Sequence, residues 1–179
     1  MAQIEDGKGT GNKAQVNNEN QLVVSAVTAT ELEHESEANG SAYNWSSDIV
    51  SIDAADTILL VKNTSDTPLH IEYVEIANGV TASEYTLHLP TAEVTLSGGS
   101  VVTGTNLNTG SSNVAEAQSR SDEEGNVQGN VIGTAWMAAD RNHKFLTPGL
   151  ILGKNKSVGV DIIAASVETA ATIVGHYED

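Results

Sequence analysis

The five histidines are the side chains of this sequence best suited to acid–base or metal chemistry, and they are scattered singly along the chain. No two of them are four residues apart, and the H-E-x-x-H pattern of zinc peptidases does not occur. The sequence also contains no G-x-S-x-G nucleophile elbow and no Walker loop. Carboxylates are numerous enough for a glycosidase pair, but only 4% of the residues are aromatic, which is few for a sugar-cleaving cleft. The sequence therefore predicts no catalytic residue and favours a non-enzymatic protein. The histidines are His34, His70, His88, His143 and His176.

Two short segments have the composition of ligand-binding loops. Asp6–Gly11 (DGKGTG) is rich in glycine, but no strand pattern precedes it and no GK[ST] follows, so we do not expect a nucleotide loop. Ser121–Asn126 (SDEEGN) offers oxygen ligands for weak calcium binding, but it lacks the alternating ligand spacing of an EF-hand. We therefore favour a solvated loop there and predict no metal and no cofactor.

Charge and composition exclude several classes of partner. The 179 residues carry a formal net charge of −16, with eight basic residues against twenty-four acidic ones. Nucleic acid binding requires basic side chains that displace counterions from phosphates, so nucleic acid is a disfavoured partner, as is an anionic membrane. No stretch approaches the ~18 apolar residues of a membrane span, and the first residues lack the features of a secretory signal. We therefore expect synthesis and retention in a cytoplasm, or release by lysis.

The stretch Thr57–Ala77 (TILLVKNTSDTPLHIEYVEIA) is the centre of the expected fold. Two β-branched, apolar runs, Ile58–Val61 and Leu69–Ile76, flank a polar connection that is typical of a turn. Pro68 lacks an N–H and fixes its own φ, so it belongs at the start of the second strand. The pattern predicts a β-hairpin at the centre of an antiparallel sandwich.

Short strand patterns separated by turn residues follow one another along most of the chain, and helix signals are almost absent. Trp45 is expected in the core, Pro148-Gly149 is expected to turn the chain, and Glu31–Ala38 is expected to form at most one short turn of helix. This organisation predicts an all-β fold, an antiparallel β-sandwich or jelly roll, over residues 22–179, with a flexible N-terminal arm at 1–21 and a long loop at 108–130. The further strands are expected in Gln21–Thr30, Ala42–Asp53, Glu84–Leu89, Ala92–Leu96, Val101–Leu107, Val131–Met137, Lys144–Leu146, Ser157–Ala164 and Thr169–Tyr177.

The opening IEDGKGTGNKAQVNNENQLVVSAVT resembles the N-terminal arm and first strand of small virion proteins of tailed bacteriophages. These proteins commonly begin with D-G-x-G-x-G-N-x-A-x-V-x-x-x-N-x-L, which matches Asp6 to Leu22 here. Ala42–Trp45, Leu60–Asn63 and Val174–Glu178 continue the resemblance, which is densest at both ends of the chain. Within this group, the chain is most similar to the head decoration (cement) proteins.

The resemblance implies a structural protein on the exterior of the capsid, made in the host cytoplasm. It implies that the chain binds the shell of major capsid protein and forms a homo-oligomer, a trimer. Contacts with the capsid or with neighbouring subunits are expected in the arm and first strand, at Ile4, Asp6, Gly7, Gly9, Gly11, Asn12, Val16 and Leu22.

Two alternatives remain open at this point. One is a tail- or baseplate-associated protein that binds a receptor or a glycan, and the other is a stand-alone carbohydrate-binding domain. An exposed Trp45 or Trp136 would favour glycan binding, whereas burial of both would count against it.

Overall fold

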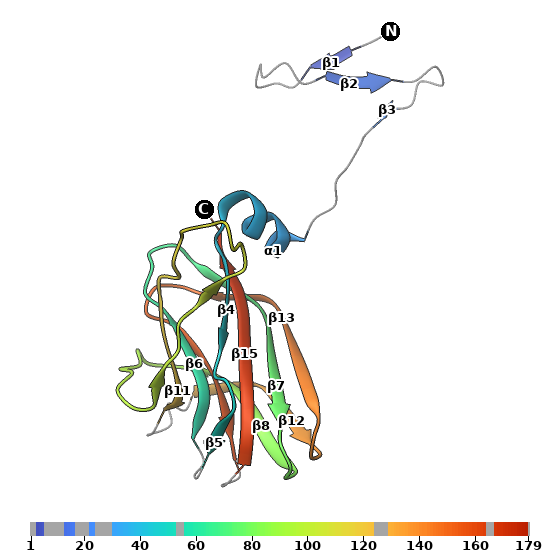
Figure 1. Ribbon diagram of the computed structural model, residues 1–179. Helices are drawn as coiled ribbons and strands as arrows, with labels where there is room; N and C mark the ends of the chain where they lie inside the picture. The colour runs from blue at the N-terminus through green and yellow to red at the C-terminus, as the bar shows by residue number, and fades with distance from the viewer. Residues whose placement is uncertain are drawn as a thin grey trace. The chain divides into compact units, whose positions relative to one another are not determined.

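The structure is a computed structural model, and it describes residues 3–5, 13–16, 22–23, 30–52, 56–123, 129–163 and 167–178. The chain divides into two units, Met1–Thr30 and Glu31–Asp179. In the first unit, β1 (Gln3–Glu5), β2 (Lys13–Val16) and β3 (Leu22–Val23) form an antiparallel sheet in chain order (Figure 1). The rest of the first strand expected from the sequence lies outside the described residues, apart from Thr30.

The second unit contains two six-stranded antiparallel sheets, which confirms the predicted all-β sandwich. The first, here the β15 sheet, has the order β10–β4–β15–β7–β13, and β5 also pairs with β15. The second, here the β14 sheet, has the order β12–β8–β14–β6–β11–β9. A helix α1 (Glu31–His34), continued by a π-helical turn (Glu35–Asn39), precedes β4. The β15 sheet comprises β4 (Ala42–Ser46), β5 (Val50–Ile52), β7 (Leu69–Asn78), β10 (Thr105–Asn106), β13 (Asn142–Leu152) and β15 (Val167–Tyr177). The β14 sheet comprises β6 (Thr57–Asn63), β8 (Ser83–Pro90), β9 (Ser100–Val101), β11 (Ala117–Glu123), β12 (Gly129–Met137) and β14 (Ser157–Ile162).

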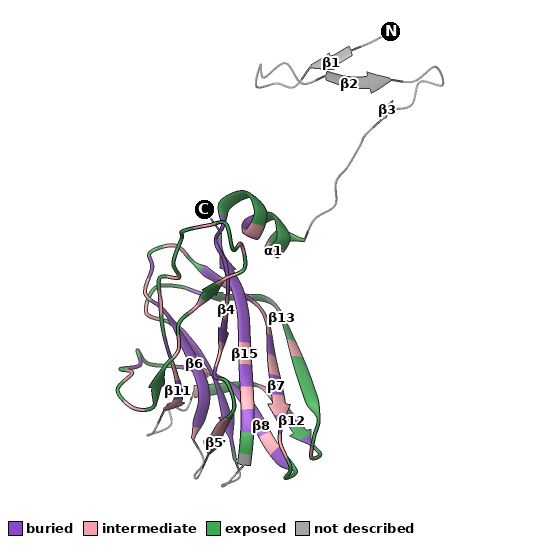
Figure 2. Cartoon of the chain, in the orientation of Figure 1, coloured by how far each residue is buried: buried purple, intermediate pink, exposed green. Residues whose placement is uncertain are grey.

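The core lies between the two sheets, where alternate residues of each strand meet. Val158, Val160 and Ile162 of β14 all point inward, as the alternation of the sequence predicts. Trp45 of β4 is fully buried, so its predicted core position is confirmed. Figure 2 shows buried residues concentrated in β4, β6 and β15, while β13 is largely exposed. Every residue of β14 is buried as well.

The predicted hairpin of Thr57–Ala77 is wrong, although both of its strands exist. β6 belongs to the β14 sheet and β7 to the β15 sheet, so residues 64–68 cross from one sheet to the other. Every residue of β6 is buried, and the strand pairs with β14 and β11 rather than with its neighbour in sequence. The buried Asn63 holds the crossing, because its Nδ2 donates to the carbonyl oxygens of Thr67 (3.0 Å) and Leu152 (2.9 Å).

The predicted strand Ala92–Leu96 is also wrong. Residues 91–99 form an irregular strap on the outer face of the β14 sheet. Lys62 Nζ donates to Val94 O (2.9 Å) and pairs with Glu93 Oε1 (2.8 Å), and Arg120 Nη1 donates to Gly98 O (2.6 Å). Val94 of the strap is buried. Because the strap covers the outer side of β6, that strand is buried on both faces and carries apolar residues on both.

Two further expectations need correction. The predicted loop at 108–130 contains β11, which pairs with β6 and β9. The inward residues of β11 include the buried Ser119 and Ser121, so the strand lacks the apolar alternation by which strands are recognised. Pro148-Gly149 does not end the strand, because β13 continues through an irregularity between Leu146 and Leu150.

Candidate functional site

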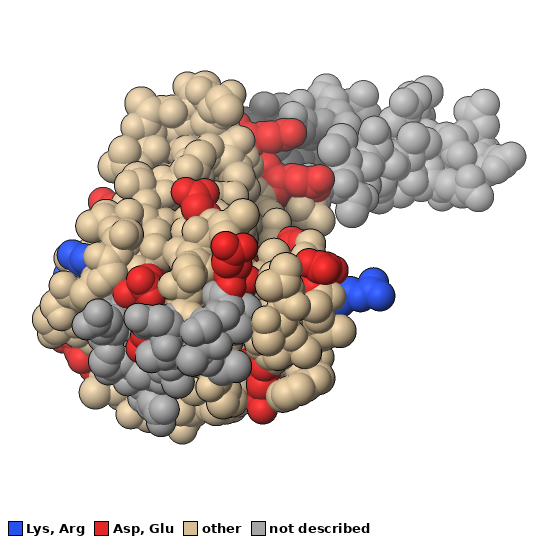
Figure 3. All heavy atoms as spheres, turned by 60° about the horizontal axis from the view of Figure 1, so that its bottom comes forward, with Lys and Arg blue, Asp and Glu red and all other residues tan. Residues whose placement is uncertain are grey.

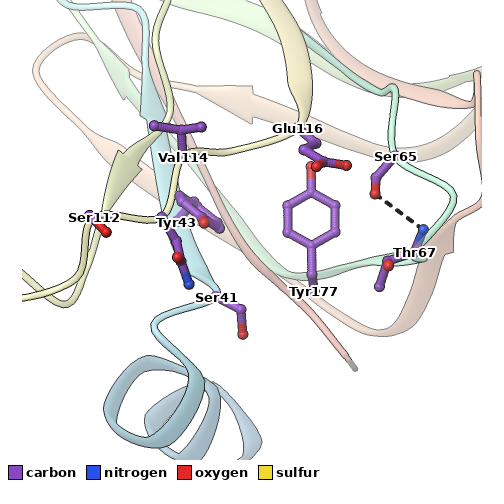
Figure 4. Close-up of a pocket in the computed structure, with 9 residues that line it drawn as sticks. Ser41, Tyr43, Ser65, Thr67, Ser112, Val114, Glu116 and Tyr177 are labelled. Carbon is purple, nitrogen blue, oxygen red and sulfur yellow. Dashed lines mark hydrogen bonds between the residues drawn. The ribbon is translucent and has the colours of Figure 1, made fainter.

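One end of the sandwich holds a pocket of about 400 Å³, which we call the tyrosine pocket. Four separate segments build it: the start of β4, the β6–β7 crossing, the stretch between β10 and β11, and the end of β15. Figure 4 shows these segments meeting around the ring of Tyr177. Its lining residues are Ser41, Tyr43, Ser65, Thr67, Ser112, Asn113, Val114, Glu116 and Tyr177.

Two tyrosines form the inner wall of the pocket. Their rings stand nearly at right angles, with centroids 5.8 Å apart, and Tyr43 also contacts Trp45 at 6.1 Å between ring centroids. The backbone N–H of Tyr177 donates to Ser41 O (3.0 Å), which fixes the last residue of β15 against the start of β4. On its other side, Gly175 lets β15 lie close to β7, because a Cβ there would collide with the backbone carbonyl of His70.

The rim of the pocket is held by hydrogen bonds rather than by apolar packing. The backbone N–H of Thr64 donates to Glu116 O (3.0 Å) and its hydroxyl donates to the same oxygen (2.8 Å), which joins the crossing to the stretch before β11. Ser65 Oγ accepts from the N–H of Thr67 (3.2 Å). Asn113 Nδ2 donates to Asn39 O (3.0 Å), which ties the opposite rim to the π-helical turn. Both sides of the opening are therefore ordered by the protein itself.

The titratable groups of the pocket are acidic in character. Burial raises the pKa of Tyr177, and the neighbouring Tyr43 and Glu116 raise it further, so the phenol stays protonated at neutral pH. None of the described residues that line the pocket is basic, and Glu116 is the carboxylate among them. The pocket therefore favours neutral groups that donate and accept hydrogen bonds over anions.

The turn beside the pocket contains a buried carboxylate. Burial opposes ionisation of Glu35, but hydrogen bonds from Asn39 Nδ2 (2.6 Å) and Ser41 Oγ (2.7 Å) to Glu35 Oε2 outweigh it, and the pKa of Glu35 is lowered. The charged carboxylate thus anchors the π-helical turn next to Ser41. Its role is structural, because its Oε2 already accepts these two hydrogen bonds.

A second surface lies where both sheets end side by side. β12 is the last strand of the β14 sheet and β13 is the last strand of the β15 sheet. A cleft of about 320 Å³ between them is lined by Leu87, Ile132 and Phe145, among other residues. We call the exposed apolar side chains of these strands the open edge, and they are exposed by 44% to 73%. The open edge consists of Val131, Ile132, Trp136, Leu146 and Ile151.

A buried polar cluster on the β14 sheet brings a threonine, a histidine and an aspartate together. His88 Nε2 lies 2.6 Å from Thr86 Oγ1 and 2.9 Å from Asp161 Oδ2, and Thr57 Oγ1 donates to Asp161 Oδ1 (2.6 Å). A nucleophile–histidine–aspartate relay requires the hydroxyl and the carboxylate on opposite ring nitrogens. Here both contact Nε2, so the cluster is not such a relay.

The residues that the sequence predicts as capsid or subunit contacts all belong to the first unit, and three of them lie on its strands. Ile4 pairs with Ala14 across β1 and β2, and Val16 pairs with Leu22 across β2 and β3. The structure thus brings two of the predicted positions, Val16 and Leu22, together. The others, Asp6, Gly7, Gly9, Gly11 and Asn12, lie outside the described residues.

Sequence reasoning missed the tyrosine pocket entirely. Its residues come from four stretches that are far apart in the chain, so no local spacing marks them. One signal was available, because the chain has only four tyrosines and two of them, Tyr43 and Tyr177, line this pocket. Trp136 is 72% exposed, which meets the criterion set above for glycan binding, whereas Trp45 does not.

No protein-family model matches the chain, and comparisons with curated proteins and with solved structures return no significant match. Within the part of the chain that the structure describes, no helix is long and apolar enough to cross a membrane. The described residues also contain no group of three or more His, Asp or Glu side chains arranged to hold a metal ion.

Proposed function

We propose that this chain is a non-enzymatic structural protein of a virion, which decorates and stabilises the capsid of a tailed phage. In this proposal it binds the shell of major capsid protein on the exterior of the particle and forms a homotrimer. The observation that supports the proposal is the open edge, because exposed apolar side chains gathered on neighbouring strands are typical of surfaces that contact another protein. The resemblance of the N-terminal sequence to phage virion proteins gives the type of assembly.

Of the two strands of the open edge, β13 carries Lys144 and Pro148, whereas β12 lacks such protecting residues. Natural sheets blunt their edges with charged side chains, especially lysine, or with proline, because unpaired backbone groups there can pair with another chain. β12 (GNVIGTAWM) contains neither a charged residue nor a proline, and among the strands that the structure describes it pairs with β8 alone. Together with the exposed Leu146 and Ile151 of β13, it presents apolar area that subunit contacts bury. We assign this edge to the contact between copies in the trimer.

The charge of the remaining surface complements this assignment. The chain carries a formal net charge of −16, and Figure 3 shows acidic side chains spread over one end of the molecule with basic ones only at the margins of the view. Like charges repel copies that approach in the wrong orientation, whereas the uncharged β12 does not. A protein present in many copies on one particle benefits from this combination.

The N-terminal unit supplies the contact with the shell in this proposal. Its predicted contact positions include Ile4, Val16 and Leu22, which lie on β1, β2 and β3. Because the sandwich has its own core, we expect the second unit to fold when residues 1–21 are deleted. The test is co-sedimentation of the full chain and of the chain lacking residues 1–21 with assembled shells of major capsid protein. We expect saturable binding of the full chain and its loss on deletion, and equal binding by both would contradict the role of the arm.

A tail- or baseplate-associated receptor- or glycan-binding module is the second candidate. The observation in its favour is Trp136, whose ring is 72% exposed on the outer face of β12, opposite Glu84 of β8. An exposed indole offers a large, flat surface for stacking against a partner. This candidate predicts binding to host cells that survives deletion of residues 1–21, an outcome that the decoration proposal does not give.

A further inference from the structure

The hydroxyl of Tyr177 is buried without a protein partner. The residue is 7% exposed, and its Oη forms no hydrogen bond with any of the described residues. Buried polar groups in native proteins are nearly always hydrogen-bonded, and an unpaired one costs free energy. Another buried tyrosine of this chain follows the rule, because Tyr85 Oη donates to Asn78 Oδ1 at 2.5 Å. Tyr177 Oη is one of several buried polar atoms without a partner among the described residues, and it is the one that belongs to a residue lining the tyrosine pocket.

The position of the unpaired hydroxyl points to a ligand. Tyr177 lines the tyrosine pocket, and Figure 4 shows its ring directed toward the carboxylate of Glu116. A protonated phenol needs an acceptor, and a carboxylate needs a donor. A single alcohol hydroxyl serves both groups at once, because it accepts from Tyr177 and donates to Glu116.

The other polar residues that line the pocket also carry groups that donate and accept hydrogen bonds. The hydroxyls of Ser41, Ser65, Thr67 and Ser112 and the amide of Asn113 surround the opening. Tyr43 adds an aromatic wall beside Tyr177. A pocket of about 400 Å³ falls within the size range of small-molecule sites, which combine ring surfaces with a few well-placed polar groups. The hydrogen bonds of the rim hold these groups in place before a ligand arrives.

We propose that the tyrosine pocket binds a neutral carbohydrate, one of whose hydroxyls joins Tyr177 Oη to the Glu116 carboxylate. The serine, threonine and asparagine side chains bind the other hydroxyls of the sugar, and the ring of Tyr43 packs against its apolar face. Glu116 disfavours anionic sugars. This inference goes beyond capsid decoration and does not depend on it, since a sugar site at one end of the sandwich is compatible with either location in the particle.

The experiment measures binding of neutral sugars to the full chain by saturation-transfer NMR and isothermal titration calorimetry. The probes are galactose, glucose, N-acetylglucosamine, lactose and cellobiose, and the anionic probe is N-acetylneuraminic acid. We expect at least one neutral sugar to bind and the anionic one not to bind. Tyr177→Phe removes only the hydroxyl and is expected to weaken binding about five- to tenfold, and Glu116→Gln is expected to weaken it as well.

Tyr73→Phe is the matched control. Tyr73 lies on β7, outside the pocket, and its ring contacts Lys144 Nζ at 3.3 Å, a contact that phenylalanine retains. We expect this variant to bind the sugar like the wild type. The proposal is overturned if no neutral sugar binds, if Tyr177→Phe binds as well as the wild type, or if N-acetylneuraminic acid binds more tightly than the neutral sugars. These results leave capsid binding untouched, so failure of this inference is distinguishable from failure of the proposed function.

Discussion

Replacing Tyr177 with phenylalanine removes a single buried oxygen, and the structure predicts that the free protein becomes more stable. The hydroxyl is buried and receives no hydrogen bond from the described residues, so the native state without a ligand bears the cost of an unpaired polar group. The phenylalanine ring keeps the edge-to-face contact with Tyr43. Groups that a ligand is meant to satisfy commonly destabilise the free protein in this way.

The expected size follows from the energetics of unpaired buried groups. Such a hydroxyl costs about 1–3 kcal/mol, and partial relaxation around it reduces the gain, so we expect Tyr177→Phe to raise the free energy of unfolding by about 1 kcal/mol. For a domain of this size, that corresponds to a rise of roughly 2–4 °C in Tm. Tyr85→Phe makes the opposite prediction, because it deletes the bond to Asn78 Oδ1 and leaves that buried acceptor unpaired, at a cost of about 1–3 kcal/mol.

The assay is urea unfolding followed by tryptophan fluorescence. Trp45 is fully buried, so its emission reports loss of the core. The two variants differ from the wild type by one oxygen each, which makes them matched controls for one another. If Tyr177→Phe lowers the free energy of unfolding as much as Tyr85→Phe does, the Tyr177 hydroxyl has a partner in the native protein and the argument for an unpaired group is refuted.

Three further predictions concern packing, association and pH. Gly175→Ala is expected to cost about 1–3 kcal/mol in urea unfolding, because its Cβ would collide with a backbone carbonyl of β7, whereas Gly153→Ala meets nothing within 4 Å and should change little; equal effects would contradict this packing. Ile132→Lys is expected to reduce the mass of the proposed trimer in sedimentation velocity, whereas Val101→Lys, at a 72% exposed residue of β9 on the opposite edge of the β14 sheet, should not; an unchanged mass for Ile132→Lys would contradict the assignment of the open edge to contacts between copies. Burial raises the pKa of Asp161, so the stability that its protonated form contributes is complete at acid pH and is lost as pH rises through the native pKa. The stability of Asp161→Asn relative to wild type should therefore grow from acid to neutral pH, and a difference independent of pH would contradict the raised pKa.

The fold class was predictable because local alternation survives in most strands. Val158, Val160 and Ile162 share one face in the sequence pattern and share the core in the structure. The pairing of strands was not predictable from the same information. β6 and β7 have the composition of a hairpin, yet each finds partners remote in the chain, β14 and β11 for one and β15 and β13 for the other. Composition shows that a strand will be buried but not which sheet will bury it.

The strap at residues 91–99 and strand β11 show a second limit of prediction from local sequence patterns. Ala92–Leu96 alternates like a strand, but the structure uses Val94 to cover the outer face of the β14 sheet through side-chain bonds to its backbone. β11 does not alternate in hydrophobicity, because the small Ser119 and Ser121 point inward and are buried. In both places tertiary contacts override local propensity. The tyrosine pocket lies beyond sequence reasoning for the same reason, since it exists only once four distant segments meet.

If a tailed phage encodes this chain, as we propose, the most direct test of the proposed function is its copy number in purified particles of that phage. Quantitative mass spectrometry gives its molar ratio to the major capsid protein. The decoration proposal predicts a near-stoichiometric ratio that falls sharply when residues 1–21 are deleted. A few copies per particle would contradict decoration and favour a tail location, and complete absence of the chain would overturn the virion proposal altogether.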